Sequence, residues 1–385
     1  MNRLLATLVF LALGGTAAAE GPRARALGVP FEGKTGPLNA ITDVDGVTVG
    51  QVTLIEDLSN GHKVRTGVTA VLPRGRDTLD TPSFAGWFPL NGNGEMTGTA
   101  WLDESGQLEG PIMLTNTHSV GVVRDAVIAW RIRQGAADAS GYWWSLPVVA
   151  ETYDGHLNDI NGFHVGAQDA ARALDQARGG PVAEGNVGGG TGMVCHEFKC
   201  GIGTASRRIS EAGKDYTVGV LVQANYGLRD SLRIAGVPVG QELRNDRIYS
   251  EPDPEADETG SIIIVVATDA PLLPHELKRV ARRASMGLAR MGSYSGNGSG
   301  DIFIAFSTAN GAALKGQPLA QASFLGIENV DSVFEATVQA TEEAIVNAMV
   351  AARDMQGEDG HYAKALPHAA LVGLLKKYNR YSGPP

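Results

Sequence analysis

Apolar residues recur along this chain at two spacings, which predict strands at some positions and helices at others. Residues 41–56 alternate in polarity and predict a hairpin. Further strands are expected at residues 68–72, 111–114, 216–224 and 301–308 and in the β-branched run that begins at Ser261. Helical spacing occupies residues 123–134, 167–178, 275–291 and 331–353. Strand runs follow one another with helices between the groups, so the pattern favours a layered α/β or α+β domain.

Composition limits the class of protein. The chain has 385 residues, of which 43% are hydrophobic and 19% charged, which suffices for one large core or two smaller ones. This apolar content excludes disorder as the main state. The net charge of −10 argues against general binding to a nucleic-acid backbone, so no nucleic-acid partner is expected. The 50 glycines follow no collagen period and indicate tight turns and close backbone contacts.

The first residues have the plan of a secretory signal. Residues 1–19 combine Arg3, a short apolar run and three alanines before Glu20. The run is too short for a stable membrane span, although an uncleaved anchor is the alternative interpretation. No later segment is a candidate span, so we expect a soluble protein in the periplasm or outside the cell.

Two cysteines, Cys195 and Cys200, allow three interpretations. An exported protein can form a disulfide, and His196 between them adds a third possible zinc ligand. No second ligand pair follows, so no metal is expected. A buried reduced pair is the favoured interpretation.

Common catalytic motifs are absent from the sequence, and the Gly260-Ser261 junction remains as a candidate catalytic site. The chain has no Gly-x-Ser-x-Gly, His-Glu-x-x-His or Walker-type sequence. The polar, acidic segment 243–260 ends abruptly at Gly260-Ser261. Cleavage there would give Ser261 a free α-amine with a pKa of about 7.7–8, which can act as the base for its own hydroxyl. From the pattern alone, an ordinary loop before a strand is favoured.

A family resemblance changes that balance. The stretch ETGSIIIVVATDAPLLPHELKRVARRASMGL, which contains Ser261, resembles the self-processing L-aminopeptidase D-amidase/D-esterases and β-peptidyl aminopeptidases. Four further segments match in the family's order and extend the resemblance over most of the chain: VAETYDGHLNDI at 149–160, GNVGGGTGM at 185–193, VGVLVQANYG at 218–227 and NGSGDIFIAFSTAN at 297–310.

The resemblance implies an architecture. The precursor of such proteins cuts itself before the serine, which here gives an α chain of residues 20–260 and a β chain of residues 261–385. Both chains are expected to form one catalytic domain. The implied fold is a four-layered αββα sandwich of N-terminal-nucleophile type with its own connectivity. A homo-oligomer, usually of four αβ units, is also implied.

The resemblance also assigns the reacting groups. Ser261 matches the family nucleophile, and its own amine is the expected base. Asn225, in QANYG, matches an oxyanion-stabilising asparagine, and Tyr153, in ETYDG, matches a phenol near the reacting carbonyl. Without the resemblance, Asn225 is a turn residue after a strand and Tyr153 a half-buried aromatic residue.

Three further residues match groups around the substrate and the amine. Glu151 matches the carboxylate that holds the free amine of the substrate; the alternative is a surface or helix-capping glutamate. Ser299 and Asp301 match a serine and an acid that orient Ser261, or else are turn and strand-start residues. Relatives that act on β-peptides have glutamate where this chain has Asp301, whose side chain reaches less far.

The implied activity is that of an exported serine aminopeptidase without metal or organic cofactor. Ser261 is expected to form an acyl-enzyme and to release small N-terminal residues from peptides, amides or esters. One alternative is a related amide or oligomer hydrolase or an acyl transferase. Another is a non-enzymatic periplasmic binding protein that retains the fold.

Overall fold

The computed structural model describes residues 21–245, 247–248, 260–314 and 318–384. The predicted signal segment 1–19 therefore lies outside the described residues, as does most of the acidic segment before Gly260. Within the described residues, no helix has both the length and the apolar character needed to cross a membrane.

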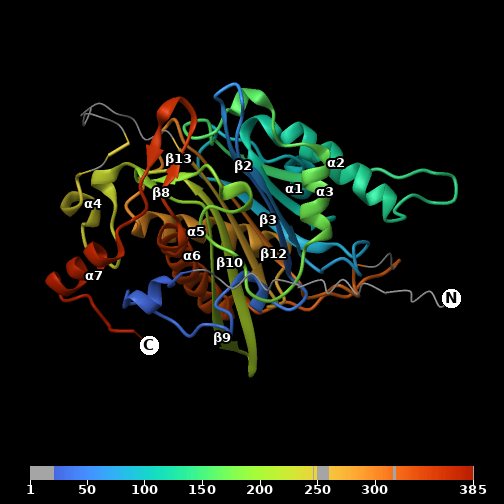
Figure 1. The fold of residues 1–385 in the computed structure, drawn as a ribbon. Helices are drawn as coiled ribbons and strands as arrows, with labels where there is room; N and C mark the ends of the chain where they lie inside the picture. Colours follow the sequence, from blue (N-terminus) through green and yellow to red (C-terminus); the bar gives the residue numbers. More distant parts are fainter. Residues whose placement is uncertain (1–20, 246, 249–259, 315–317, 385) are drawn as a thin grey trace, which may run out of the picture.

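Two sheets form the centre of the molecule (Figure 1). The smaller sheet has the order β1-β2-β5-β6, and only its β5–β6 pair is parallel. Its strands are β1 (Thr48–Asp57), β2 (Lys63–Leu72), β5 (Ile112–Asn116) and β6 (Val148–Thr152). The larger sheet has the order β4-β3-β12-β11-β10-β9, and only β11 and β12 are parallel. Its strands are β3 (Ser83–Pro89), β4 (Gln107–Leu108), β9 (Ile202–Glu211), β10 (Lys214–Asn225), β11 (Ser261–Thr268) and β12 (Gly300–Ser307).

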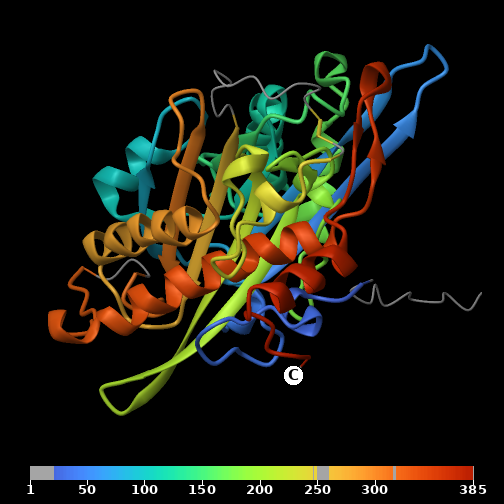
Figure 2. The same ribbon diagram turned by 90° about the vertical axis from the view of Figure 1, so that its left-hand side faces the viewer.

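Helices cover the outer face of each sheet. Helices α2 (Val120–Arg133) and α3 (Ala167–Asp175) pack on the smaller sheet. Helices α5 (Pro274–Arg290) and α6 (Asp331–Ala351) lie across the strands of the larger sheet (Figure 2). A separate cluster of buried apolar residues, which includes Leu114, Ile263 and Ile304, fills the space between the two sheets. The layers therefore run α-β-β-α, which confirms the predicted architecture.

Shorter elements connect and border these layers. The remaining helices are α1 (Thr99–Ser105), α4 (Val239–Glu242) and α7 (His368–Lys377). Two small hairpins pair β7 (Val194–Cys195) with β8 (Phe198–Lys199) and β13 (Met355–Gln356) with β14 (Tyr362–Ala363). The 3₁₀ turns are Ala24–Leu27, Ile41–Asp43, Thr117–Ser119, Ile160–Gly162, Gly188–Gly190, Arg229–Ser231, Ile327–Asn329 and Glu358–Gly360.

The predicted elements form at their expected positions with one exception. The strand that begins at Ser261 and the helices predicted from residues 275 and 331 differ from β11, α5 and α6 by no more than a few residues. The hairpin predicted within residues 41–56 is wrong. Residues 41–43 form a 3₁₀ turn, and β1 pairs with β2 instead.

Side-chain hydrogen bonds explain this difference. The Ile41 N–H donates to Thr204 Oγ1 over 2.8 Å, and the Asp43 carboxylate accepts the hydroxyl of Ser206 over 2.6 Å. Both partners lie on β9, so the segment is held against the larger sheet. Alternation along a short segment indicates extended chain, but it does not identify the partner strand.

Candidate active site

Ser261 is the first residue of β11, in the interior of the larger sheet. It pairs with Asn225 of β10 on one side and with Gly300 of β12 on the other. Ser261 is buried, with 6% of its surface exposed. The rest of β11 is a fully buried run of apolar residues and one threonine, which fixes this strand between its neighbours.

The residue before Ser261 has no space for a side chain. A Cβ atom on Gly260 would lie 2.5 Å from the Asn225 carbonyl oxygen and 2.5 Å from Tyr226 Cα. The Gly260 carbonyl accepts the Gly300 N–H over 3.0 Å. Glycine is therefore required here, because only a bare backbone fits between these neighbours.

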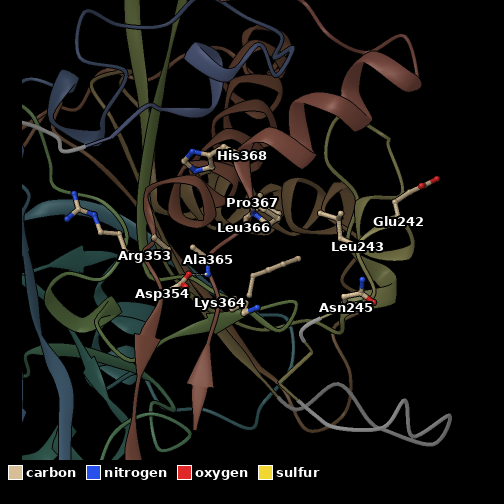
Figure 3. A pocket seen from close by; sticks show the side chains of 12 residues that line it. Glu242, Leu243, Asn245, Arg353, Asp354, Lys364, Ala365, Leu366, Pro367 and His368 are labelled. Atoms are coloured by element: carbon tan, nitrogen blue, oxygen red, sulfur yellow. Dashed lines mark hydrogen bonds between the residues drawn. The ribbon is translucent and has the colours of Figure 1, made fainter. Parts of the chain in front are cut away.

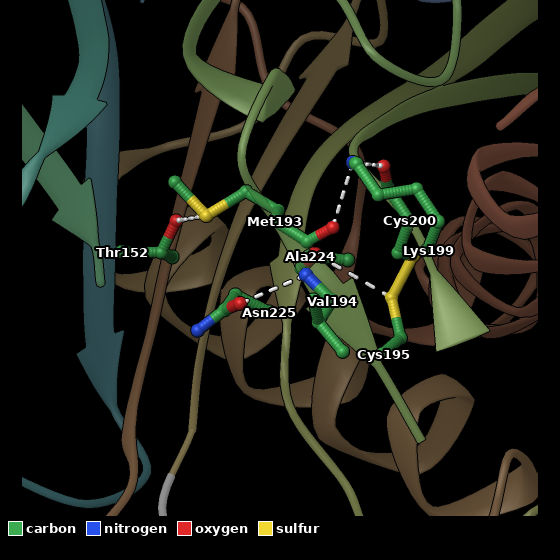
Figure 4. The surroundings of a disulfide bond; sticks show 8 residues. All are labelled: Thr152, Met193, Val194, Cys195, Lys199, Cys200, Ala224 and Asn225. Carbon is green, nitrogen blue, oxygen red and sulfur yellow. Dashed lines mark hydrogen bonds between the residues drawn. A yellow bond between two sulfur atoms is a disulfide. The ribbon is translucent and has the colours of Figure 1, made fainter. Parts of the chain in front are cut away.

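Asn225 ends β10 beside Ser261, and its side-chain amide is held in one orientation. Asn225 Oδ1 accepts the N–H of Val194 over 2.9 Å. Figure 4 shows the amide nitrogen turned away from Val194. The hydrogen bond thus uses the acceptor end of the amide, and no described residue accepts from its nitrogen, so the donor end is available to an oxyanion.

A disulfide joins Cys195 to Cys200 next to this amide (Figure 4). The prediction of a reduced pair is therefore wrong. The β7–β8 hairpin reverses the chain and brings the two Cα atoms to 5.4 Å, which is within disulfide range. The zinc interpretation also fails for these residues, because both sulfur atoms are bonded to each other.

Ser299 directly precedes β12 and Asp301 is its second residue, on either side of the Gly300 that pairs with Ser261. Asp301 pairs with Ile262, the residue after the predicted nucleophile. Its Oδ1 accepts the Ser299 hydroxyl over 2.8 Å, and its Oδ2 accepts the Asn91 side-chain amide over 3.3 Å. Burial raises the Asp301 pKa, and the hydrogen bonds from Ser299 and its other donors oppose that rise.

Glu151 is buried near the end of β6. Its Oε1 accepts the backbone N–H of Glu95 over 3.0 Å, and its Oε2 accepts the hydroxyl of Thr117. Burial raises the Glu151 pKa, an effect that these two hydrogen bonds oppose. Only 3% of the Glu151 surface is exposed, which contradicts the alternative of a surface glutamate. Its two hydrogen-bond donors, Glu95 N–H and the Thr117 hydroxyl, are not a helix N-terminus, which contradicts the alternative of a helix cap.

Gly94 lies close both to Glu151 and to β12, the strand beside Ser261. A Cβ atom on Gly94 would lie 3.4 Å from Glu151 Oε1 and 3.0 Å from Gly300 Cα. Since Gly300 pairs with Ser261, the carboxylate and the serine belong to one neighbourhood. The two groups come from different sheets, and the sheet-to-sheet packing brings them together.

Tyr153 is placed differently from the other predicted site residues. It follows β6 and is 51% exposed. A Cβ atom on Gly155 would lie 2.4 Å from the Tyr153 hydroxyl oxygen, so the ring lies over its own loop. Among the described residues no hydrogen-bond partner holds this hydroxyl, and the phenol is less firmly positioned than Asn225.

Two residues that hold the buried carboxylates, Asn91 and Thr117, are not predicted from the sequence. Asn91 lies in an Asn-Gly-Asn-Gly stretch after β3, and Thr117 follows β5 in Thr-Asn-Thr-His. Polar and glycine-rich stretches at strand ends often carry functional residues, and this was the only sequence pattern that pointed to them. Nothing in the local sequence indicates which carboxylate each residue contacts.

One cavity among the described residues has no lining residue in common with the surroundings of Ser261. It has a volume of about 780 Å³ and is bordered by residues of α4, β8 and α7 and of the segments beside them, including Phe198, Leu243, Lys364 and His368 (Figure 3). None of the predicted site residues lines it. Among the described residues, no cluster of three or more histidine, cysteine, aspartate or glutamate side chains could hold a metal ion.

Comparison with known proteins agrees with this geometry. Residues 39–363 match peptidase family S58. The β-peptidyl aminopeptidase BapA of Sphingosinicella microcystinivorans is 54% identical over 395 residues, which cover 97% of each chain. The solved L-aminopeptidase D-Ala-esterase/amidase of Ochrobactrum anthropi, a variant of the Ntn hydrolase fold, superposes with a TM-score of 0.88 at 49% identity, covering 94% of this chain and 99% of that chain. A β-aminopeptidase from a Burkholderia species gives a TM-score of 0.83 at 49% identity, covering 92% and 99%.

The fold and these comparisons define a hydrolase of the N-terminal-nucleophile class. The chain belongs to peptidase family S58, and its family membership supports aminopeptidase activity.

Proposed function

We propose that this protein is an exported serine aminopeptidase that activates itself by cleaving the Gly260–Ser261 bond. The observation that carries the proposal is the position of Ser261. It begins an interior strand, with the Asn225 amide on one side and the start of β12, with its buried Asp301, on the other.

Self-cleavage follows from this position. Ser261 Oγ attacks the Gly260 carbonyl carbon, the Gly260–Ser261 amide bond breaks, and the hydroxyl proton passes to the departing amine. Water then hydrolyses the resulting ester, which leaves a carboxylate on Gly260 and a free amine on Ser261. The products are the proposed α chain, residues 20–260, and the β chain, residues 261–385.

In turnover, the Ser261 amine takes the proton of its own hydroxyl as the oxygen attacks the substrate carbonyl. The Asn225 amide donates to the oxyanion that develops, and the Tyr153 phenol would need to swing away from Gly155 to add a second donor. Ser299 and Asp301 hold the Ser261 amine in position. The leaving amine takes the proton, and water releases the acyl group.

Glu151 explains why the enzyme would act at a chain end. Its buried carboxylate accepts two hydrogen bonds and forms no direct ion pair among the described residues, although a charge on His118 would lower its pKa. The ammonium group of a substrate N-terminus supplies that partner, and only a chain end has one. Binding of this cation lowers the raised Glu151 pKa and so favours the ionised carboxylate.

Relatives indicate the substrate class. Their names describe action on β-peptidyl, L-aminoacyl and D-alanyl ester or amide substrates. We extend to this chain the hydrolysis of peptides, amides and esters that carry small N-terminal residues. Export through residues 1–19 and assembly into four αβ units belong to the same proposal.

The test is the denatured mass of the purified protein beside its Ser261→Ala variant. Wild type should give two fragments divided before Ser261, and Ser261→Ala should give one inactive chain. Ser285→Ala, which changes a half-buried serine of α5, is the matched control and should process normally. A single chain from wild type that hydrolyses no alanyl or β-alanyl anilide would exclude the proposal and favour a binding protein.

A second assay separates hydrolysis from acyl transfer. A mixture of water and an added amine acceptor should yield mainly the free acid if the protein is an aminopeptidase. A product formed mainly on the added amine would favour an acyl transferase instead.

A further inference from the structure

Lys199 is a buried lysine that the proposed mechanism does not use. It ends β8 with none of its surface exposed. Its Nζ donates to the carbonyl oxygens of Met193 over 2.8 Å and Cys200 over 2.6 Å. No described carboxylate forms an ion pair with it, and burial alone places its pKa well below the ordinary lysine value.

One peptide group joins Lys199 to the candidate oxyanion donor. The Met193 carbonyl accepts the Lys199 amine and also the Cys200 N–H, which lies 3.0 Å away. The N–H on the other side of the same peptide, that of Val194, donates to Asn225 Oδ1 over 2.9 Å. Figure 4 shows these contacts side by side.

The electronic structure of amides connects the two ends of this chain of hydrogen bonds. Resonance couples the carbonyl and the N–H of a planar peptide. Donation to the Met193 oxygen therefore makes the Val194 N–H a stronger donor. Donation to Asn225 Oδ1 polarises the side-chain amide in the same direction and strengthens its own N–H groups, the donors that the proposed function assigns to the oxyanion.

We infer that Lys199 is a positioning residue for Asn225, which it orients and polarises through the Met193–Val194 peptide. The inference rests on the proposed function, because it needs Asn225 to be the oxyanion donor. Lys199 touches neither the substrate nor Ser261. The Cys195–Cys200 disulfide closes the β7–β8 hairpin, which contains Lys199 and Val194 and directly follows Met193.

A purely structural role explains this lysine poorly. A buried amine without a carboxylate partner costs free energy relative to an apolar side chain of similar length. The Met193 carbonyl would keep the Cys200 N–H as a donor if Lys199 were absent. Methionine at this position would thus leave the hairpin's backbone–backbone hydrogen bonds intact and remove the amine with its two hydrogen bonds, to the carbonyls of Met193 and Cys200.

The test is a double-mutant cycle on processed enzyme with a β-alanyl or alanyl anilide as the substrate. Rates are divided by the concentration of free Ser261 N-termini, so that incomplete processing does not enter kcat. Lys199→Met should lower kcat about tenfold and leave KM within about twofold, a smaller loss than removal of a direct oxyanion donor causes. Against Asn225→Ala, the same substitution should cause no further loss. Lys278→Met, which removes an exposed lysine, should leave kcat unchanged.

An unchanged kcat in Lys199→Met overturns the inference, as does an equal loss in the Asn225→Ala background. If Lys199→Met does not process, Lys199→Gln replaces it under the same criteria. Failure of both variants to process, with a lower unfolding temperature, also overturns the inference, because lysine would then serve the fold. A full kcat for Asn225→Ala instead overturns the assignment of Asn225 in the proposed function itself.

Discussion

Asn225 and Ser261 face each other as the last residue pair of the antiparallel ladder between β10 and β11. Directly opposed residues in such a ladder have Cβ atoms about 4.5–5.5 Å apart. The separation is fixed by backbone hydrogen bonds, so the candidate donor and the candidate nucleophile hold their places without a flexible loop. The Val194 N–H holds the Asn225 amide by its oxygen, and Lys199 donates to the carbonyl of the same Met193–Val194 peptide.

Replacing Asn225 with aspartate should separate orientation from donation. The Asn225→Asp side chain still accepts the Val194 N–H, but it cannot donate to an oxyanion. We expect kcat to fall by at least the 10²–10³ or so that loss of one oxyanion donor costs, with little change in the unfolding temperature. Steady-state kinetics and a thermal melt measure both. Activity near that of wild type would show that the oxyanion is stabilised elsewhere.

Adding a methyl group to Gly260 should impair self-cleavage. In Gly260→Ala, the new Cβ atom would meet the Asn225 carbonyl oxygen and Tyr226 Cα at 2.5 Å. The backbone must shift, which moves the scissile carbonyl from the Ser261 hydroxyl. We expect processing to slow at least tenfold, measured by denatured mass at successive times after synthesis.

Gly326→Ala is the control for this substitution. Gly326 has a φ of −60° and open space around its Cα, so an added methyl group meets nothing within 4 Å. Its processing should match that of wild type. Equal rates for Gly260→Ala and Gly326→Ala would contradict the proposed constraint.

Neutralising Glu151 should weaken substrate binding at the free amine. Glu151→Gln preserves the shape of the side chain but removes the charge that pairs with an ammonium group. A charge-assisted hydrogen bond contributes about 1.5–3 kcal/mol, so KM should rise roughly 10- to 150-fold. Substrates that lack the α-amine should be poor for wild type and unaffected by the substitution. A KM that stays constant for an alanyl anilide would exclude the ammonium-binding role.

Asp154 should make stability fall as pH rises through the acid range. Burial raises the pKa of its carboxyl from 3.8 to about 7. Between these values the folded chain holds a proton that the unfolded chain has released, so the free energy of unfolding decreases as pH increases. The stabilising contribution is complete below about pH 4 and is lost as pH rises through about 7.

The matched experiment is a series of thermal melts from pH 4 to pH 8. Asp154→Asn should show a shallower decline in the unfolding temperature than wild type, because an amide does not titrate. Asp125→Asn changes an exposed carboxyl and should follow the wild-type curve. Parallel curves for all three proteins would refute a titrating Asp154.

Reduction of the Cys195–Cys200 disulfide should destabilise the protein and slow catalysis. Loop-closure entropy for so short a loop gives about 2 kcal/mol of stabilisation. The hairpin also carries Val194, so a looser hairpin holds the Asn225 amide less firmly. We expect a Cys195→Ala/Cys200→Ala double variant to unfold at lower temperature and to have a lower kcat than wild type. Identical stability under oxidising and reducing conditions would contradict the structural role.

The sequence by itself determined the elements and the order of the candidate site residues. The β-branched run after Ser261 predicted β11, and helical spacing predicted α5 and α6, because these signals are local and repeat with the geometry of the backbone. The matching segments also placed the nucleophile and its neighbours along the chain. Their shared arrangement in space was implied by resemblance alone.

Only the tertiary structure decided which segments are partners. Packing of two sheets brings Glu151 of β6 towards Ser261 of β11, and chain reversal at a two-residue turn closes the disulfide. Asn91 and Thr117 reach the buried carboxylates from distant positions along the chain. The physical reason is the same in each case: periodicity is a property of neighbouring residues, whereas strand pairing, burial and hydrogen-bond partners depend on contacts between segments far apart in sequence.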